Sequence, residues 1–305
     1  MSDAPLVTIA IPAFNSEEWL EECVRSALAQ SHENREVLVI DDGSTDGTAE
    51  VARAFGDAIH FVSRENRGSN PTRNEMLALA RGEWIQFLDA DDFLLADKLK
   101  SNLAATRSVN AGADAVYGPV LEDGVSTTFD DADDLFTRWI RWQFCQTGGM
   151  LWKTKPLRKI GGWNEEYPCC QDNELCARAL QNGLDFAFDP QPGAVYRIHQ
   201  NTLSRGNPVR VIDRKMRLQE AMLSWLEEHG HATEAHRHAT GRALFESLRM
   251  LARHDLPEAV RREKQLGAEG RLRMDGPAAP PSYRMLHSVL GFRLAEKTAG
   301  MLRSR

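Results

Sequence analysis

The chain has 305 residues, of which 42% are hydrophobic, and its formal net charge is −7. This length allows one large domain with an ample core and a smaller appended one, and the acidity argues against nucleic acid as a partner. No apolar run reaches the length of about 18 residues that a membrane span needs, and the start lacks the basic segment of a signal peptide, so the sequence predicts a cytoplasmic protein.

Strand and helix patterns alternate through the first part of the chain. Four apolar runs predict strands, at residues 7–11, 37–40, 59–62 and 84–88. Between them, Ser16 is expected to cap a first helix, the polar segment 41–48 leads into a second, and residues 71–81 predict a third. This order predicts an α/β fold with a mostly parallel sheet and right-handed crossovers.

Polar segments follow three of these strands directly, namely Pro12–Asn15, Asp41–Asp42 and Asp89–Asp91. In parallel sheets ligands bind beyond the carboxyl ends of the strands, and those ends meet at one edge. The sequence therefore predicts a single site assembled from all three segments.

The rest of the chain divides into a mixed part and a helical part. Further strands are predicted at 115–117, 186–188 and 194–199, and further helices at 135–140 and 173–182. From residue 208 the pattern is helical, and the segment from 283 is amphipathic, with five basic residues against one acid. These shifts predict a first domain over residues 1–205 and a helical extension over residues 206–305.

The cysteines are five in number and lack paired CxxC spacing, so they predict neither a disulfide framework nor a zinc site. They are Cys23, Cys145, Cys169, Cys170 and Cys176. We expect structural thiols, including the two beside Asp172.

The stretch Asp89-Ala90-Asp91 allows two interpretations. In extended backbone its two carboxylates face the same side, and oxygen ligands of this kind suit Mg²⁺ or Mn²⁺ and thereby a nucleoside diphosphate. Alternatively, one aspartate caps the helix that begins near residue 96 while its neighbours are solvated. The tripeptide by itself leaves both open.

Asp41 and Asp42 also allow two interpretations. They can accept hydrogen bonds from a nucleobase or ribose, with an aromatic side chain stacking on the base, or they can organise the turn before Gly43. The chain has neither GxGxxG nor GxxxxGK[ST], so a dinucleotide fold and a P-loop are not indicated.

Six stretches together resemble the family-two inverting glycosyltransferases, which have the GT-A fold. In chain order they are IPAFN at 11–15, DDGSTDGT at 41–48, ENRGSNPTRNEML at 65–77, GEWIQFLDADD at 82–92, GGWNEEYPCCQDNELCARAL at 161–180 and YRIHQNTLS at 196–204. The resemblance covers about residues 5–205 and implies a sugar-nucleotide donor, a divalent metal (Mn²⁺ or Mg²⁺) and transfer with inversion.

The resemblance also implies roles for individual residues. The nucleotide-sugar donor would be bound by Pro12, Ala13, Phe14, Asn15, Asp41, Asp42, Asn66, Gly68, Arg73, Asp89 and Ala90. Asp91 would ligate the metal, and His199 either matches a position that approaches the metal or the diphosphate or is a structural histidine on a closing strand. Asp172 would be the catalytic base. The family often has Glu-Asp at this point, whereas this chain has Gln171-Asp172.

The chemistry needs one general base. A diphosphate leaving group bound to a metal needs no proton donor, but the acceptor hydroxyl must lose its proton as it attacks. A free aspartate has a pKa of about 3.9, and a base works best nearer the operating pH. We therefore expect Asp172 to be partly desolvated, near Trp152 or Trp163.

The acceptor is less well defined by the sequence. Four tryptophans are possible sugar-stacking residues, namely Trp139, Trp142, Trp152 and Trp163, with Gln171 beside the base. We expect at least two of these indoles to be core. The basic C-terminal segment suits peripheral contact with the inner face of a membrane and a lipid-linked acceptor, or packing on the main domain or in a homodimer.

Three functions remain open on these grounds. The leading one is an inverting transferase that uses a UDP-sugar to build a surface polysaccharide or glycolipid. A sugar-1-phosphate nucleotidyltransferase would need a Gly-rich basic loop after the first strand, and residues 12–18 contain no Lys or Arg. A non-catalytic nucleotide-sugar binding protein would not need both Asp91 and Asp172.

Overall fold

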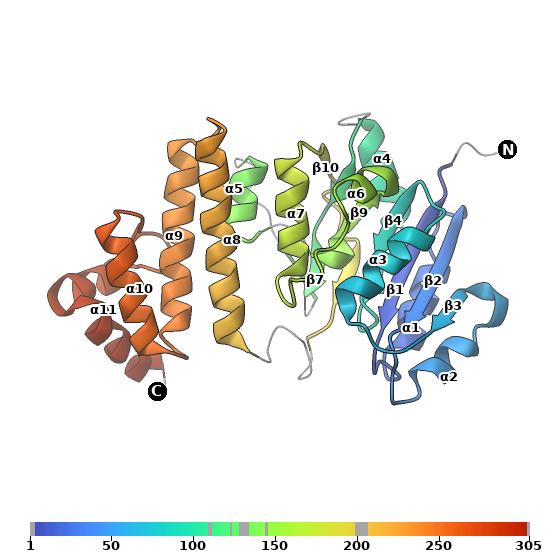
Figure 1. Ribbon diagram of the computed structural model, residues 1–305, viewed down its shortest axis with the longest axis horizontal. Helices are drawn as coiled ribbons and strands as arrows, with labels where there is room; N and C mark the ends of the chain where they lie inside the picture. The colour runs from blue at the N-terminus through green and yellow to red at the C-terminus, as the bar shows by residue number, and fades with distance from the viewer. Residues whose placement is uncertain are drawn as a thin grey trace. The chain divides into compact units, whose positions relative to one another are not determined.

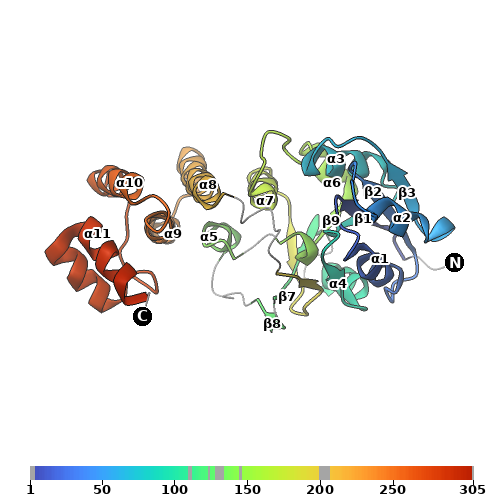
Figure 2. The same cartoon turned by 90° about the horizontal axis from the view of Figure 1, so that it is seen from below.

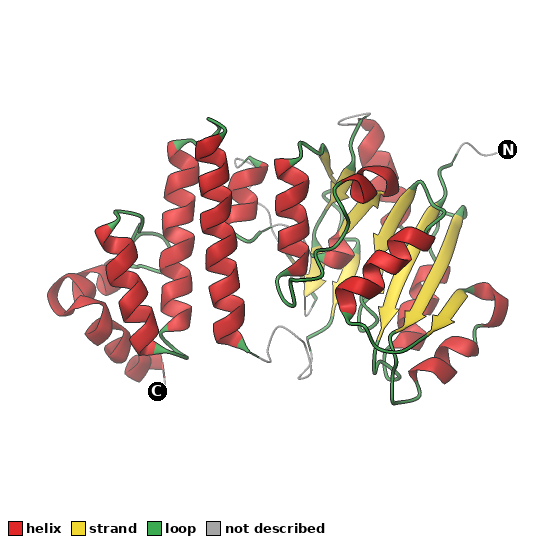
Figure 3. Ribbon diagram, viewed as in Figure 1, coloured by secondary structure: helices red, strands yellow, loops and turns green. Residues whose placement is uncertain are grey.

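The computed structural model describes residues 4–108, 112–122, 124–127, 134–143, 146–198 and 207–303 (Figure 1). Two compact units make up the chain, the first from Met1–Asp131 and Phe144–His199, the second from Ala132–Gln143 and Gln200–Arg305. All strands of the described residues belong to the first unit (Figure 3). None of the helices in the described ranges has the length and apolar character to cross a membrane.

A seven-stranded sheet forms the centre of the first unit. Across the sheet the strands are β10 (Phe186–Phe188), β6 (Ala115–Tyr117), β9 (Met150–Lys153), β4 (Trp84–Phe87), β1 (Val7–Ala13), β2 (Arg35–Asp41) and β3 (His60–Ser63). Neighbours are parallel except at β9, which runs antiparallel to β4 and β6. The predicted α/β class with a mostly parallel sheet is confirmed, whereas β9 was not predicted.

Helices cover both faces of this sheet. Helices α3 (Ser69–Leu79) and α6 (Thr154–Lys159) lie on one face, and α1 (Leu20–Leu28) and α4 (Lys98–Ser108) lie on the other (Figure 2). The short α2 (Thr48–Arg53) and the 3-10 turn η1 (Gly56–Ala58) lead into β3. The consecutive apolar side chains of β1 and β2 are buried on both faces of the sheet between these layers, which explains their continuous apolar runs.

Ser16 does not cap α1 with its side chain, which corrects the prediction. Its hydroxyl donates to the carbonyl of Phe14, and α1 begins only at Leu20. The backbone N–H of Ser16 donates instead to Oγ1 of Thr48 at 2.7 Å. The polar residues that look like a helix start are thus used to hold the loop after β1 against the loop after β2.

A second, four-stranded sheet lies beside the first in the same unit. Its order is β5 (Phe93–Leu94), β11 (Ala194–Tyr196), β7 (Val120–Glu122) and β8 (Val125–Ser126). The run predicted to close the main sheet at 194–199 therefore forms β11 of this smaller sheet. Its antiparallel pairing with β5 brings the chain after β11 back to the acidic turn that precedes β5.

The second unit is a helical bundle. It contains α5 (Leu135–Ile140), α8 (Pro208–Glu228), α9 (Glu234–Leu251), α10 (Leu256–Ala268) and α11 (Pro281–Arg303), the last interrupted at Gly291, which has φ 71°. Side chains at the N-caps of α8, α9 and α10 accept backbone N–H groups, so the predicted helical extension has well-defined helix starts.

Helix α5 belongs to this bundle, although the sequence placed it within the first domain. Phe136 stacks on Trp225 with ring centroids 5.9 Å apart, and buried Gln219 donates to the carbonyl of Ile140 at 2.7 Å. The domain boundary at 205/206 lies outside the described residues and stays a prediction.

Candidate active site

The three polar segments lie together at the carboxyl ends of strands in the main sheet. In the register of the sheet, Ala13 at the end of β1 pairs with Asp41 at the end of β2, and Ala10 pairs with Phe87 at the end of β4. The backbone N–H of Asp42 donates to the carbonyl of Ala13 at 2.8 Å. The parallel strands thus deliver the loops after β1, β2 and β4 to the same edge, as the sequence predicted.

Asp41 and Asp42 are both buried and hydrogen-bonded within the protein. Asp41 accepts the N–H of Ser44 at 3.0 Å and the hydroxyl of Ser63 at 2.8 Å. Asp42 accepts the N–H groups of Arg67 and Gly68 at 2.9 and 2.8 Å and forms an ion pair with Arg64.

The contact with Ser44 fits the interpretation that Asp41 organises the turn before Gly43, whereas Asp42 binds the loop after β3 instead. The role of both aspartates in base binding stays a prediction.

Arg64 is a residue that the sequence analysis missed. Besides Asp42, it contacts Glu75 at 2.8 Å and the hydroxyl of Thr72 at 2.8 Å, both on α3. It therefore ties the loop after β2 to the helix that carries Arg73. Its position one residue before the motif that begins at Glu65 is the signal that could have found it.

The loop after β1 leaves one aromatic ring open to solvent. Phe14 is 49% exposed, whereas Ala13 is 1% exposed and packs in the core of the unit. Asn15 accepts the N–H of Thr45 at 2.9 Å, and Asn66 is exposed in the loop after β3. The methyl group of Ala13 is buried in the core, so only its backbone is left for the predicted contact with a base, which stays a prediction, and the exposed ring is that of Phe14.

The segment 89–92 forms a turn and not an extended strand, which corrects the geometry assumed for its carboxylates. The N–H of Asp92 donates to the carbonyl of Asp89 at 3.0 Å. Ala90 is 5% exposed and its side chain packs in the core, and its role in binding the donor stays a prediction. Side chains do not alternate in a turn, so the carboxylates of Asp89 and Asp91 are not arranged as those of alternate residues in an extended strand would be.

Asp89 forms an ion pair with Arg73, with 2.5 Å between Oδ1 and Nη2. The guanidinium of Arg73 is largely buried and lies over the ring of Trp163, 4.7 Å from its centroid. Burial opposes its charge, but Asp89, Asp172 and Asp91 together raise the pKa of Arg73 above its ordinary value. Arg73 is thus a cation that several carboxylates of the site share.

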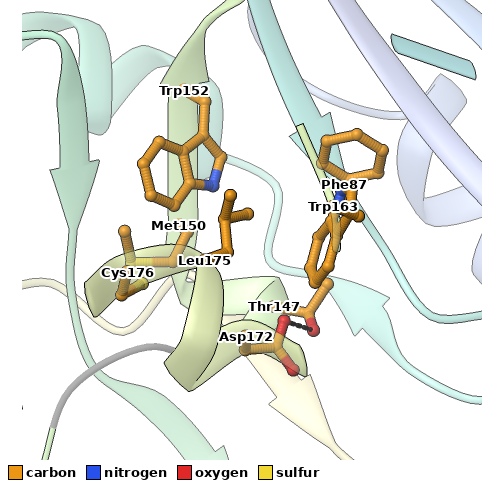
Figure 4. Close-up of a pocket in the computed structure, with 8 residues that line it drawn as sticks. All are labelled: Phe87, Thr147, Met150, Trp152, Trp163, Asp172, Leu175 and Cys176. Atoms are coloured by element: carbon orange, nitrogen blue, oxygen red, sulfur yellow. Dashed lines mark hydrogen bonds between the residues drawn. The ribbon is translucent and has the colours of Figure 1, made fainter. Parts of the chain in front are cut away.

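Asp172 lies in the first turn of α7 (Gln171–Gln181), and Figure 4 shows its carboxylate facing Thr147. The hydroxyl of Thr147 donates to Oδ1 of Asp172 at 2.7 Å. The pKa of Asp172 is raised to about 6, chiefly because of burial and also because of the charge of Asp89, while Arg73 and the hydrogen bond from Thr147 limit the rise. The expectation that Asp172 is partly desolvated is confirmed.

The 3-10 turn η2 (Thr147–Gly149), which carries Thr147, is held by a buried lysine. Nζ of Lys98 donates to the carbonyl of Gly149 at 3.1 Å and to Asn102 at 2.5 Å. Burial lowers the pKa of Lys98 to about 7, while Asp189 raises it. Neither Thr147 nor Lys98 was singled out by the sequence, because each belongs to a segment without a recognised motif.

A very small cavity of about 10 Å³ adjoins Asp172 (Figure 4). Trp152 and Trp163 line it, and each is 3% exposed. Trp163 meets Phe87 edge to face, with centroids 5.5 Å apart. Neither indole has an exposed ring face on which a sugar could stack, which argues against their predicted stacking role. Trp139 is also buried.

Polar residues of α3 hold the segment that leads into α7. Nδ2 of Asn70 donates to the carbonyls of Asn164 and Tyr167, and Asn74 exchanges two hydrogen bonds with the backbone of Trp163. Gln171, predicted to face the acceptor, donates to the hydroxyl of Ser69 at 2.9 Å. The spacing of polar residues three and four apart on one helix is the sequence signal for this role.

Arg197, just after β11, closes the acidic turn from the other side. Its N–H donates to Asp92 at 2.9 Å and its Nη1 to the carbonyl of Asp91 at 3.0 Å. Burial raises the pKa of Asp92 to about 8, and the charges of Asp89 and Asp91 add to the rise. His199, predicted to approach the metal, lies outside the described residues.

The donor set at this edge fits a hard divalent ion that brings most of its own ligands. Among the described residues no three His, Cys, Asp or Glu side chains gather as a metal site, and no disulfide joins the four described cysteines. Mg²⁺ usually binds one or two carboxylates and completes its shell with water and substrate phosphates. Asp91 is half-buried beside the negative charge of its neighbours, so it suits such an ion.

The chain matches the sequence model of Glycosyl transferase family 2 over residues 8–162, just over half of its length. It is 34% identical over 143 residues to Bacillus subtilis TuaG, named as a teichuronic acid biosynthesis glycosyltransferase, covering 42% of this chain and 57% of TuaG. An uncharacterized glycosyltransferase of Haemophilus influenzae is 40% identical over 103 residues, covering 32% of this chain and 41% of that protein. The chain thus spans about half the length of these curated relatives.

Solved structures share the fold at low sequence identity. Residues 1–349 of S. aureus TarS in complex with UDP-GlcNAc superpose with a TM-score of 0.67 at 16% identity, covering 97% of this chain and 91% of that one. The mannosyltransferase PcManGT from Pyrobaculum calidifontis, in complex with GDP-Man and Mn²⁺, gives a TM-score of 0.53 at 18% identity, covering 99% and 88%. The GT-A fold implied by the sequence resemblance is confirmed.

Proposed function

Because the chain belongs to Glycosyl transferase family 2, we propose that it transfers a sugar from a nucleoside-diphosphate donor to a hydroxyl of a glycan or lipid-linked acceptor, with inversion. The observation that carries the mechanism is Asp172. Its carboxylate lies near the end of β4, is coupled electrostatically to Arg73 and to Asp89 of the loop after β4, and has a pKa raised by burial to about 6. TuaG supports a role in cell-surface polysaccharide synthesis.

Asp172 is the proposed general base. With a pKa of about 6 it is mostly ionised at neutral pH, yet it binds a proton more tightly than a free aspartate. Thr147 occupies Oδ1, so Oδ2 is the oxygen that would take the acceptor's proton. As the hydroxyl oxygen bonds to the anomeric carbon, the bond from that carbon to the diphosphate oxygen breaks on the opposite side, and the nucleoside diphosphate leaves.

The remaining residues would bind and orient the donor. Phe14 offers its exposed ring to the base, and the loop held by Asp42 would border the nucleotide. Arg73 fixes Asp89 and stabilises the ionised form of Asp172. Mg²⁺ or Mn²⁺ held by Asp91 would supply Lewis-acid stabilisation of the diphosphate. The complexes of TarS with UDP-GlcNAc and of PcManGT with GDP-Man and Mn²⁺ support a nucleotide sugar and a metal, and we favour a uridine nucleotide.

A thermal-shift panel tests this proposal. The wild type is compared with Asp91→Ala in UDP, GDP, dTDP and CDP, each with and without Mn²⁺. A ligand at about 100 times its dissociation constant adds about 2.7 kcal/mol of stability. Metal-dependent stabilisation by one nucleotide, lost in Asp91→Ala but kept in the control Asp57→Ala, is the expected result, since Asp57 is exposed in η1.

Product analysis distinguishes the reaction itself. Incubation with the stabilising nucleotide as its sugar conjugate should release the nucleoside diphosphate and yield a glycosylated acceptor. Formation of a sugar nucleotide from a nucleoside triphosphate would instead indicate a nucleotidyltransferase. The absence of any nucleotide-induced shift, with or without metal, would contradict the proposed site.

A further inference from the structure

Helix α11 exposes an unusual amount of apolar surface. Among the residues that the structure describes, twelve large apolar side chains are exposed, and six of them belong to α11: Met285, Val289, Leu290, Leu294, Met301 and Leu302. Their exposed fractions range from 41% to 76%. The core-facing positions of the same helix are already filled by Tyr283, Phe292 and Ala295. Apolar side chains gathered in this way mark an interaction surface.

The described charges exposed on this helix are all positive. Arg284, Arg293 and Lys297 are exposed, whereas Glu296 is 7% exposed and forms an ion pair with Arg249 at 2.5 Å. We name the exposed side chains the α11 face, which comprises Arg284, Met285, Val289, Leu290, Arg293, Leu294, Lys297, Met301 and Leu302. It therefore combines apolar side chains with three exposed cations.

A hollow adjoins the α11 face. It has a volume of about 720 Å³ and is lined by side chains of α9 and α11, including Met250, Leu286 and Leu302. Arg253 and Glu246 lie at its wall, and Arg249, which also lines it, is paired with Glu296, so the hollow adds apolar area with little change in net charge. The apolar surface of α11 thus continues onto α9.

We propose that the α11 face docks on a membrane surface that contains anionic lipid. Exposed apolar side chains enter the boundary between headgroups and acyl chains, and nearby Lys and Arg are attracted by the lipid phosphates. The break at Gly291 divides α11 into two shorter segments, each with its own exposed apolar side chains. This inference rests on the proposed function and narrows its acceptor to a lipid-linked one.

A second copy of the chain fits this face less well. In a two-fold symmetric dimer a surface patch meets itself, so the three cations of one copy would face those of the other. No exposed acid among the described side chains of α11 could pair with them. An anionic surface avoids this repulsion between cations, because it neutralises them while covering the apolar side chains.

Vesicle flotation tests the proposal with the full chain. Phosphatidylcholine vesicles with and without about 30% phosphatidylglycerol are compared. The variants are the triple substitution Arg284→Gln, Arg293→Gln and Lys297→Gln, and the triple substitution Met285→Ser, Val289→Ser and Leu294→Ser. The matched control Lys100→Gln, Arg210→Gln and Lys264→Gln removes the same charge from exposed positions outside α11.

The wild type and the control are expected to float with the anionic vesicles. Each cation near an anionic surface is worth about fivefold in partitioning, so the α11 charge variant should bind about 100-fold more weakly. The serine variant should also lose binding while it keeps the wild-type melting temperature.

Three results would overturn the proposal. The first is a wild type that does not float with anionic vesicles, and the second is a control that loses as much binding as the α11 charge variant. The third is a lipid-free dimer, found by light scattering, that the serine variant converts to a monomer, which would assign the α11 face to a second copy. Nucleotide-induced thermal shifts, measured without lipid, report separately whether the proposed function holds.

Discussion

The substitution Asp172→Asn removes a titrating carboxyl but keeps an oxygen that can accept the hydrogen bond from Thr147. Loss of a general base is expected to reduce turnover by about 10²- to 10⁴-fold. The same substitution is expected to stabilise the fold, because it removes a charge that burial disfavours. Opposite effects on activity and stability distinguish a catalytic carboxylate from a structural one.

The size of the stabilisation follows from the pKa. Asp172 has a pKa of about 6 in the folded protein against an ordinary 3.8. The folded state therefore binds the proton more tightly than the unfolded state, and the destabilisation grows as the pH rises through this interval and is complete above it. Because one unit is worth about 1.36 kcal/mol, the asparagine variant should gain about 1.5 kcal/mol at about pH 5 and about 3 kcal/mol at about pH 8.

Urea unfolding followed by tryptophan fluorescence at the two pH values measures this gain, alongside a transfer assay. Asp57→Asn, at an exposed carboxyl, is the control and should change stability by less than about 0.5 kcal/mol. Equal stability of Asp172→Asn and wild type at both pH values, with turnover above about a tenth of wild type, would refute the assignment of Asp172 as a desolvated base.

Thr147→Val should shift the acid side of the pH profile of kcat/KM to higher pH, because the hydrogen bond from Thr147 lowers the pKa of Asp172. Thr147→Ser should restore the wild-type profile. An unchanged profile in the valine variant would speak against the contact. Phe14→Ala removes a ring that is 49% exposed, so calorimetry should show nucleotide affinity weakened by about 1–3 kcal/mol with the melting temperature unchanged, and an unaltered affinity would exclude stacking. Gly43 has φ +75°, and Gly43→Ala would place a Cβ 2.6 Å from the backbone nitrogen of Asn66. Chemical unfolding should show that the free energy of unfolding falls by more than about 1 kcal/mol. Gly124 has φ +76°, and a Cβ there would have no atom within 4 Å, so Gly124→Ala should lose less stability. Equal losses of stability in the two variants would attribute the effect to φ alone.

Some features of the site could not be predicted because they depend on contacts between distant segments. Ser16 is a residue type that often caps helices, but its backbone N–H donates to Thr48, which follows the loop after β2. The acidic segment after β4 was expected to be extended, yet Asp92 closes a turn onto Asp89. In both places a long-range or turn hydrogen bond overrides the local pattern.

The sequence by itself determined the order of strands and helices through β4 and the carboxyl ends of the strands at which three polar loops meet, whereas Asp172 was proposed from the family resemblance. Apolar periodicity and the geometry of parallel strands are local or topological, so one chain suffices to read them. Only the tertiary structure decided that Thr147 and Arg73 tune the carboxylate of Asp172, and that α5 belongs to the helical bundle. These depend on which side chains approach through space and on how far burial removes water from a charge, and neither is encoded in residue spacing.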